Sequence, residues 1–349
     1  EALIWPAEMI DEFPWRRSIG KKDAMGVGYE TEREVWKEPV GVVGVIVPWN
    51  FPMEITLNKL GPVLAMGNTC VLKPAPDTSA TALRLARLIV EKTDIPPGVV
   101  NIVTSQDHLT GEVLTTSPDV DMVAFTGSSA TGKRIMEAAS STLKPVFLEL
   151  GGKSANIYLD DVDIETSLAS AVTSCMHGGQ GCAIATRLLV PREHYDAAVD
   201  AAAAGFAGWS YGDPTDAANL QGPQVSKKQQ DRVLGYIEKG KEEGARVVTG
   251  GGVPAHLDKG FYVEPTLFAD VDNSMTIAQE EIFGPVICVI AYDDDDDAVR
   301  IANDSAFGLS GNIFSADLER AKQMAARIRT GTLGINGGVW FGADAPFVG

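Results

Sequence analysis

The feature that most constrains the fold is a regular alternation of short apolar runs with stretches of helical periodicity. Five runs rich in β-branched residues lie at 41–47, 69–73, 99–103, 121–125 and 146–150. Between the second and third, Leu83, Ala86 and Val90 recur at helical spacing, and two prolines follow as a stop. This order predicts parallel strands joined by crossover helices. The fold class is therefore α/β with a doubly wound sheet, whose ligand crevice lies at the carboxyl ends of the strands.

A second α/β series follows the glycine pair Gly151 and Gly152, where we place a domain boundary. Its strands are expected at 155–159, 187–190, 285–292 and 332–336, with helices from about Ile164 and over 197–207. Ser226 and Gln229 have the spacing of a capping box that opens a helix to about residue 243. Residues 20–37 alternate polar and apolar side chains and are expected to form an exposed strand or hairpin.

Composition and charge exclude several classes of protein. Hydrophobic residues make up 45% of the 349 and charged residues 22%, which is typical of a globular enzyme and not of a disordered or fibrous chain. The net charge of −18 opposes binding to a phosphate backbone, so no nucleic-acid partner is expected. Four cysteines without paired short spacings predict thiols in a reducing compartment, and hence a cytoplasmic protein.

The N-terminal residues lack the basic start and the uninterrupted apolar stretch of a secretion signal. The longest apolar run, residues 40–49, is interrupted by glycine and proline and is far shorter than the roughly 20 residues that span a bilayer. We therefore expect no membrane partner. The first residue is Glu and the last residues, PFVG, stop without an element pattern, from which we expect an incomplete chain.

The cysteines differ in their surroundings. Cys70 and Cys288 lie inside apolar strand runs, where a thiol usually acts as a small buried hydrophobe. Cys182 lies in the glycine-dense loop GGQGCA before a strand, where backbone N–H groups are open, and it is a candidate nucleophile or a structural cysteine beside a turn. Cys175, His177 and Cys182 do not have the spacing of a zinc site, so no metal is expected there.

Two polar residues follow apolar strands. Glu149 ends the run 146–150, where a carboxylate is costly unless it is exposed, paired or used as a base. Asn50, in PWNFP, directly follows the first strand, where an amide facing the crevice can donate to an oxyanion. The alternatives are a surface glutamate at a strand end and an ordinary turn asparagine.

An anion site is expected where residues 127–133, GSSATGK, follow a strand and open a helix. The stretch nearly fits the loop that binds nucleoside triphosphates, but Arg134 stands where a hydroxyl would hold magnesium. The alternative is a dinucleotide phosphate site without the usual G-x-G-x-x-G. The aspartates 293–297 are interpreted as the acidic start of a helix and not as a metal site.

Seven motifs then occur in register: PWNFP, KPAPDTSA, FTGSSATG, LELGGKSA, GQGCA, EEIFGPV and GTLGIN. In this order they resemble the NAD(P)-dependent aldehyde dehydrogenase superfamily, over nearly the whole chain. The resemblance implies a Rossmann-type cofactor domain with an α/β catalytic domain. It also implies Cys182 as the nucleophile, Glu149 as the general base and Asn50 as the oxyanion donor.

The resemblance further implies which residues contact the cofactor, NAD or NADP, with NAD favoured. These are Trp49, Lys73 on the adenosine ribose, Gly127 and Ser128 near the pyrophosphate, and Glu281 and Phe283 around the nicotinamide ribose and ring. Phe51, Met176, Trp340 and Phe341 match positions along an apolar aldehyde tunnel, for which the alternative is ordinary core packing. No arginine falls among them, so a short semialdehyde acid is not the expected substrate.

The implied reaction oxidises an aldehyde to a carboxylic acid. The Cys182 thiolate forms a thiohemiacetal, hydride transfer leaves a thioester, and water activated by Glu149 hydrolyses it. Alternatives are a CoA-acylating enzyme, a nucleoside triphosphatase using residues 127–133, and a truncated, non-catalytic NAD-binding remnant. Pro76 stands where many NAD-preferring members have a glutamate, which leaves the preference between NAD and NADP open.

The resemblance also implies a domain arrangement. Residues 1–19 are a remnant of the cofactor domain, 20–39 are bridging or oligomerisation strands, 40–150 form the NAD(P)-binding domain, and 151–349 form a catalytic domain truncated at its C-terminal end. Members of the superfamily extend further at both ends and assemble as homodimers or homotetramers, which is the expected assembly when those ends are present.

Overall fold

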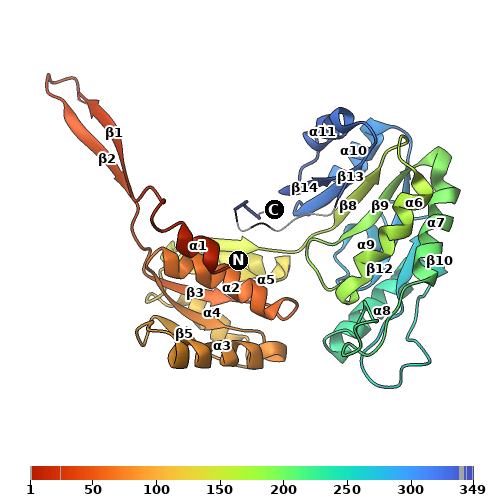
Figure 1. The fold of residues 1–349 in the computed structure, drawn as a ribbon, viewed down its shortest axis with the longest axis horizontal. Coiled ribbons are helices and arrows are strands. Elements are labelled where there is room, and N and C mark those ends of the chain that lie inside the picture. The colour runs from red at the N-terminus through yellow and green to blue at the C-terminus, as the bar shows by residue number, and fades with distance from the viewer. Residues whose placement is uncertain (1, 24, 338–341, 343, 348) are drawn as a thin grey trace. The chain divides into compact units, whose positions relative to one another are not determined.

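The computed structural model describes residues 2–23, 25–337, 342, 344–347 and 349 (Figure 1). The chain folds into two compact units, and the division falls between Glu149 and Leu150. The first unit holds a five-stranded sheet and a two-stranded one, and the second unit holds a seven-stranded sheet. No helix within the described ranges has both the length and the hydropathy that a bilayer span requires.

The first unit contains the predicted doubly wound sheet. Its strands are β3 (Val42–Ile46), β4 (Thr69–Lys73), β5 (Val100–Ile102), β6 (Met122–Thr126) and β7 (Val146–Glu149). All are parallel, in the order β5-β4-β3-β6-β7, so the direction of winding reverses beside β3. This order is that of a Rossmann-type sheet, which confirms the predicted fold class.

Helices cover both faces of this sheet. They are α2 (Pro52–Ala65), α3 (Ser79–Lys92), α4 (Leu109–Thr116) and α5 (Ser129–Ala139), with α1 (Ile4–Glu8), η1 (Pro76–Thr78) and η2 (Ser140–Thr142) as shorter pieces. α2 packs beside α3, and α4 packs beside α5. Because right-handed crossovers on the two sides of β3 put their helices on opposite faces, each pair covers one face. The core between the sheet and the pair α2 and α3 includes Val43, Val45, Leu60 and Leu72.

An antiparallel hairpin of β1 (Arg16–Lys22) and β2 (Thr31–Trp36) belongs to the same unit. Every residue of β1 is exposed, and the orange ribbon of the pair projects from its unit in Figure 1. Of the two expectations for residues 20–37, an exposed strand or a hairpin, the structure has the hairpin, but its first strand begins earlier, at Arg16.

The second unit is built on a seven-stranded sheet of order β10-β11-β12-β9-β8-β13-β14. The strands are β8 (Ser154–Tyr158), β9 (Ala185–Pro191), β10 (Arg246–Thr249), β11 (Thr266–Ala269), β12 (Val286–Tyr292), β13 (Ser310–Phe314) and β14 (Thr332–Ile335). β10 runs antiparallel to β11, and the other pairs are parallel.

Two apolar clusters pack on this second sheet. One joins β12 to Val233 and Ile237 of α8 (Lys227–Glu242) and to residues of α9 (Thr276–Gln279), α10 (Asp295–Asn303) and α11 (Leu318–Ala325). The other joins the strands to Leu168 of α6 (Ile164–Ala169), to η3 (Ser170–Gly179) and to α7 (Tyr195–Ala207), which follows η4 (Arg192–His194). Both faces of the sheet are therefore buried, as parallel sheets require.

The acidic run begins α10, as predicted. Asp294 is the N-cap and its Oδ1 accepts from the N–H of Asp297 at 2.8 Å. Arginines pair with its neighbours: Arg192 with Asp293, and Arg320 with Asp295 at 2.6 Å. These carboxylates have helical and ionic partners, and among the described residues no group of three His, Cys, Asp or Glu side chains is arranged to hold a metal ion.

Candidate active site

The residues singled out in the first unit follow the carboxyl ends of its parallel strands. Trp49 and Asn50 follow β3, Lys73 ends β4, Gly127 follows β6, and Glu149 ends β7. Gly127 donates its N–H to the carbonyl of Glu149 at 3.0 Å. Because all five strands are parallel, these residues share one edge of the sheet.

Glu149 lies in a buried environment that raises the pKa of its carboxyl group. It is 8% exposed, and its Oε1 is buried with no hydrogen-bond partner in the described part of the chain. Burial raises its pKa to about 7, against which the nearby charge of Lys59 acts. Lys59 is equally buried, its Nζ lies 5.0 Å from the centroid of the Phe147 ring, and burial lowers its pKa to about 8. A carboxyl with a pKa near 7 suits a general base at neutral pH.

Asn50 lies in the tight connection between β3 and α2. It is buried, and the helix begins two residues later at Pro52, whose fixed φ suits the first helical position. The connection therefore places the Asn50 side chain beside the start of a helix and the end of a strand. The preceding Trp49 is half-buried, and the following Phe51 is 36% exposed.

A cavity of about 570 Å³ lies beside Lys73 at this edge of the first unit. α4 contributes Glu112 and Thr115 to its wall, and α5 contributes Arg134 and Ile135. Burial lowers the pKa of Lys73, whose Nζ donates to the carbonyl of Pro74 at 3.3 Å. The volume is that of a pocket for a nucleoside-sized group.

The connection from β6 to α5 is too short for a triphosphate-binding loop. β6 ends at Thr126 and α5 begins at Ser129, so Gly127 and Ser128 alone connect them, and Lys133 lies within the helix. Ser128 is the N-cap, and its Oγ accepts from the N–H of Thr131 at 3.3 Å. The triphosphate interpretation is therefore wrong, because its cradle requires several loop residues before the helix. An anion site at the helix N-terminus remains compatible with this geometry.

Cys182 differs from the other thiols in the second unit and in the first. It is half-buried, in a turn between η3 and β9, whereas Cys70, Cys175 and Cys288 are buried free thiols. Burial raises the pKa of all three buried thiols, that of Cys70 to about 11. Cys175 lies on η3 and is fully buried, while the chain turns sharply at His177, which has a left-handed φ of 57°. Among the four, Cys182 therefore has the setting of a nucleophile.

Glycines allow the nucleophile loop and its neighbours to pack closely. A Cβ on Gly152 would lie 2.5 Å from the carbonyl oxygen of Cys182, and a Cβ on Gly151 would overlap the carboxylate of Glu281. Gly152 also donates its N–H to Glu281 Oε1 at 3.1 Å. Burial raises the pKa of Glu281. The glycine pair of LELGG, the cysteine turn of GQGC and the glutamate of EEIFG thus meet within the second unit.

Two further residues hold the segment with Glu281 and Phe283. Gln229 Nε2 donates to the carbonyl of Phe283 at 2.8 Å, and Arg232 donates to the carbonyl of Glu281 at 2.7 Å. Phe283 has a φ of 61°, a left-handed conformation that needs such support. Ser226 caps α8 as predicted, accepting from Gln229 N–H at 3.3 Å, but the Gln229 side chain reaches Phe283 and not back to the cap. No sequence signal distinguishes this role from capping.

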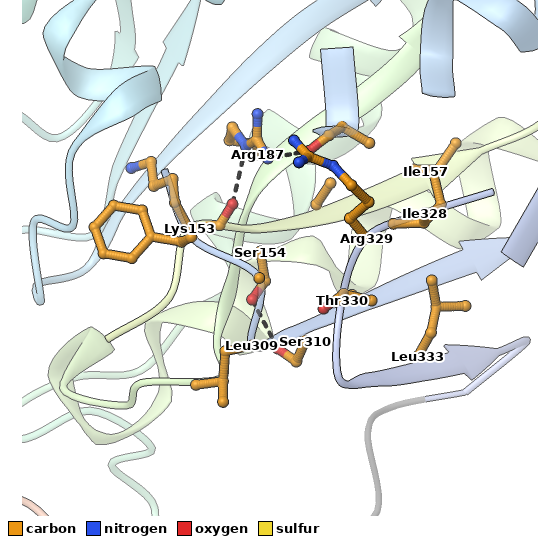
Figure 2. A pocket seen from close by; sticks show the side chains of 15 residues that line it. Lys153, Ser154, Ile157, Arg187, Leu309, Ser310, Ile328, Arg329, Thr330 and Leu333 are labelled. Carbon is orange, nitrogen blue, oxygen red and sulfur yellow. Dashed lines mark hydrogen bonds between the residues drawn. The ribbon is translucent and has the colours of Figure 1, made fainter. Parts of the chain in front are cut away.

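Arg187 of β9 fixes the chain after Gly152. Its Nε donates to the carbonyl of Lys153 at 3.0 Å, and its other nitrogens donate to Asn273, Ile301 and Ala302, each at 3.0 Å. Figure 2 shows this guanidinium against Lys153, with Ser154 facing Ser310 below it. The pocket between them, about 20 Å³, has room for one water molecule and not for a substrate.

Two of the four predicted tunnel residues lie within the described ranges, one in each unit. Phe51 belongs to the first unit, and Met176, 48% exposed on η3, belongs to the second. Trp340 and Phe341 lie outside the described residues.

The fold and these loops define a class: a Rossmann-type unit joined to a second α/β unit that carries an accessible cysteine in a glycine-lined turn. Residues 7–349 match the aldehyde dehydrogenase family. The chain belongs to that family. It is 46% identical over 316 residues to geranial dehydrogenase of Castellaniella defragrans, covering 90% of this chain and 65% of that protein. It is 44% identical to human mitochondrial aldehyde dehydrogenase, covering 89% and 60%.

Solved structures show the same fold. An aldehyde dehydrogenase of Mycobacterium tuberculosis in complex with NAD⁺ is 46% identical, with a TM-score of 0.90 over 98% of this chain and 68% of that one. A mutant of aldehyde dehydrogenase C of Pseudomonas syringae, in complex with NAD⁺ and octanal, is 40% identical, with a TM-score of 0.86 over 88% and 64%. The chain thus spans a little under two thirds of the length of several of these relatives.

Proposed function

We propose that the chain oxidises an aldehyde to a carboxylic acid with NAD as the acceptor, through a thioester on Cys182. The observation that carries this proposal is a pair of close contacts in the second unit. The turn with the half-buried Cys182 packs against Gly152, and the neighbouring Gly151 packs against the carboxylate of Glu281. The family membership and the NAD⁺ complexes of related structures support it.

The first step forms a carbon–sulfur bond. The Cys182 thiolate attacks the carbonyl carbon, and the carbonyl electron pair moves to oxygen, giving a thiohemiacetal alkoxide. The Asn50 amide and the backbone N–H of Cys182 are the proposed donors to that oxygen. Donors fixed before the reaction stabilise developing charge without reorganising.

The residues present fit a dinucleotide. The cavity beside Lys73, with the helix N-terminus at Gly127 and Ser128, suits an adenosine and its phosphates, and Glu281 and Phe283 stand on a separately braced segment for the nicotinamide ribose and ring. Trp49 completes the proposed set. When bound, NAD supplies the hydride acceptor that turns the thiohemiacetal into a thioester. NAD is proposed over NADP because the related structures hold NAD⁺.

Glu149 is proposed to complete the cycle. Its carboxylate takes a proton from water, the resulting hydroxide adds to the thioester carbonyl, and the carbon–sulfur bond breaks to release the acid and the thiolate. Because burial raises the Glu149 pKa to about 7, the fraction in the basic form, and with it hydrolysis, increases as pH rises through 7. A base in this position supports hydrolysis over transfer to coenzyme A, because water is the weaker nucleophile and depends more on losing a proton.

The test is formation of reduced nicotinamide with a panel of aldehydes, comparing the parent chain with Cys182→Ala and Glu149→Gln. We expect turnover by the parent, none by Cys182→Ala, and a single burst without steady turnover by Glu149→Gln. Steady turnover that requires added coenzyme A would support the acylating alternative. NAD binding without a burst for any aldehyde would contradict the proposal.

For the substrate, we propose an apolar aldehyde. The support is the exposed thioether of Met176 and the exposed ring of Phe51, together with the names of the relatives, a geranial dehydrogenase and an octanal complex. Higher kcat/KM for octanal or an aromatic aldehyde than for succinic semialdehyde is the expected result. The reverse order would refute this substrate class.

We further propose a cytoplasmic homodimer or homotetramer. The exposed β1–β2 hairpin offers backbone edges and apolar side chains, including Ile19 and Trp36, to a second copy. Light scattering with Ile19→Asp should show a smaller species than the parent. The three buried free thiols support a reducing compartment, which a fractionation experiment tests.

A further inference from the structure

The turn before Cys182 is an unusual conformation that needs support. His177, Gly178 and Gly179 have φ values of 57°, 65° and 68°, so three consecutive residues are left-handed. For a residue with a side chain, such as His177, this region is unfavourable because the Cβ crowds the following carbonyl oxygen. A backbone of this kind persists when its surroundings determine it.

The Gln180 side chain supplies much of that support. It is 4% exposed, and its Nε2 donates to the carbonyl of His177 at 3.0 Å and to that of Pro223 at 3.3 Å. Its Oε1 accepts from the N–H of Val225 at 2.9 Å. One amide therefore ties the left-handed turn to the segment 223–225.

A second glutamine holds the same turn from that segment. Gln224, also buried, donates its Nε2 to the carbonyl of Gly178 at 2.9 Å. A Cβ on Gly178 would lie 2.9 Å from that Nε2 and 3.1 Å from Gln180 Nε2, so both amides lie directly against the glycine. A Cβ on Gly179 would overlap the backbone of Gly284.

The chain after Cys182 is held independently. Ser310 Oγ donates to the carbonyl of Ala183 at 2.8 Å, and Ser154 Oγ lies 2.7 Å from Ser310 Oγ. Gly152 packs against the carbonyl of Cys182. The position of Cys182 is thus determined on its C-terminal side by strand residues and on its N-terminal side by Gln180.

We propose that Gln180 is a positioning residue for Cys182, holding the His177–Gly179 turn so that the thiol and the Cys182 N–H meet the aldehyde. This inference rests on the proposed function. Displacement of a reacting group by about 1 Å can cost on the order of 100-fold in rate. If Gln180 had a merely structural role, its replacement would lower the stability of the protein and leave the rate of the chemical step unchanged.

The variant is Gln180→Met, which keeps the length of the side chain and removes its hydrogen bonds. The matched control is Gln221→Met. Gln221 is fully buried, and within the described part of the chain its side chain bonds Val263 and Trp209, at 2.9 Å and 3.2 Å, and not the His177–Gly179 turn. Two measurements are made on the whole chain: the rate of the first-turnover burst of reduced nicotinamide, and hydrogen exchange of the peptide covering residues 177–185.

We expect Gln180→Met to slow the burst by about 10- to 100-fold, with KM for NAD changed less than about threefold, and to speed exchange of residues 177–185 at least about tenfold. Gln221→Met should change neither, although both variants melt at a lower temperature. A burst within about threefold of the parent, at a similar loss of melting temperature, would overturn the proposal.

If Gln180→Met does not fold, Gln180→Glu replaces it, because it keeps the acceptor for Val225 and loses donors to two carbonyls. Its burst, relative to the parent at each pH, should recover as pH falls and the introduced carboxyl gains a proton to donate. An unchanged ratio would overturn the proposal. If the parent shows no burst with any aldehyde, the proposed function fails separately, and unchanged exchange of residues 177–185 in the variant would still overturn the positioning role.

Discussion

Because its carboxyl is buried, Glu149 is expected to make the folded protein less stable at neutral pH than at acidic pH. Its pKa is about 7 in the folded chain against an ordinary 4.5, which burial causes and the charge of Lys59 partly offsets. Between these values the folded state binds more protons than the unfolded state, so the contribution of Glu149 to stability falls as pH rises from 4.5 through 7. The shift corresponds to about 3 kcal/mol in full.

The test compares Glu149→Gln with the parent by urea unfolding, followed by circular dichroism, at several pH values. Measurements stay above pH 5, because the pI of about 4.6 brings the net charge near zero and favours precipitation. The free energy of unfolding of the variant relative to the parent should rise by about 2 kcal/mol between pH 5 and pH 7.5. Any pH-independent cost of burying the new amide cancels in this slope.

Glu54→Gln is the control, because Glu54 is an exposed carboxylate on α2 of the same unit. Its difference from the parent should change little over the same range. A difference for Glu149→Gln that is constant within about 0.5 kcal/mol would refute the reasoning, since the burial of the carboxyl would then have no cost.

Three further predictions concern the site and its supports. Lys59→Met should move the pH midpoint of steady turnover upward from about 7 by about one pH unit, because the positive charge that favours ionised Glu149 is lost. Lys144→Met should leave the midpoint where it is. An unchanged midpoint in Lys59→Met would contradict this reasoning. Gly152→Ala should slow the burst at least about tenfold, because the added methyl group meets the Cys182 carbonyl. Gly235→Ala on α8, with open space around it, should keep the parent rate. Equal burst rates for the two variants would count against the packing argument. Arg187→Met should lower the free energy of unfolding by about 3 kcal/mol or more, because four buried acceptors lose a charged donor. Urea unfolding measures this loss, and a loss below about 1 kcal/mol would disprove the stabilising role of Arg187.

Much of the first unit was predictable because its three central strands, β3, β4 and β6, are mostly buried on both faces. Their β-branched runs stand out from the helical stretches, and parallel order follows from the alternation, so Asn50, Lys73 and Glu149 could be placed at strand ends. α2 was not predicted, because Phe51 and Pro52 favour a turn and Pro62 interrupts the helical pattern. Proline at the first helical position and packing against the sheet decided for a helix.

The supports of the site could not be predicted from sequence. β13 begins Ser310-Gly311, residues that are poor strand formers, and it exists because it pairs with β8 and β14 on both sides. The bonds of Gln180 to Pro223 and of Gln229 to Phe283 join residues more than forty positions apart. Such pairings depend on tertiary contacts that no local pattern records.

The unequal burial of the four thiols allows the chain to be labelled at one cysteine without any substitution. Cys70, Cys175 and Cys288 are enclosed, with pKa values raised by burial, whereas Cys182 lies half-open in its turn. A maleimide fluorophore or a spin label should therefore attach at a single place without any cysteine having been engineered away. The label would then report on the motion of one chosen loop in an otherwise unaltered protein.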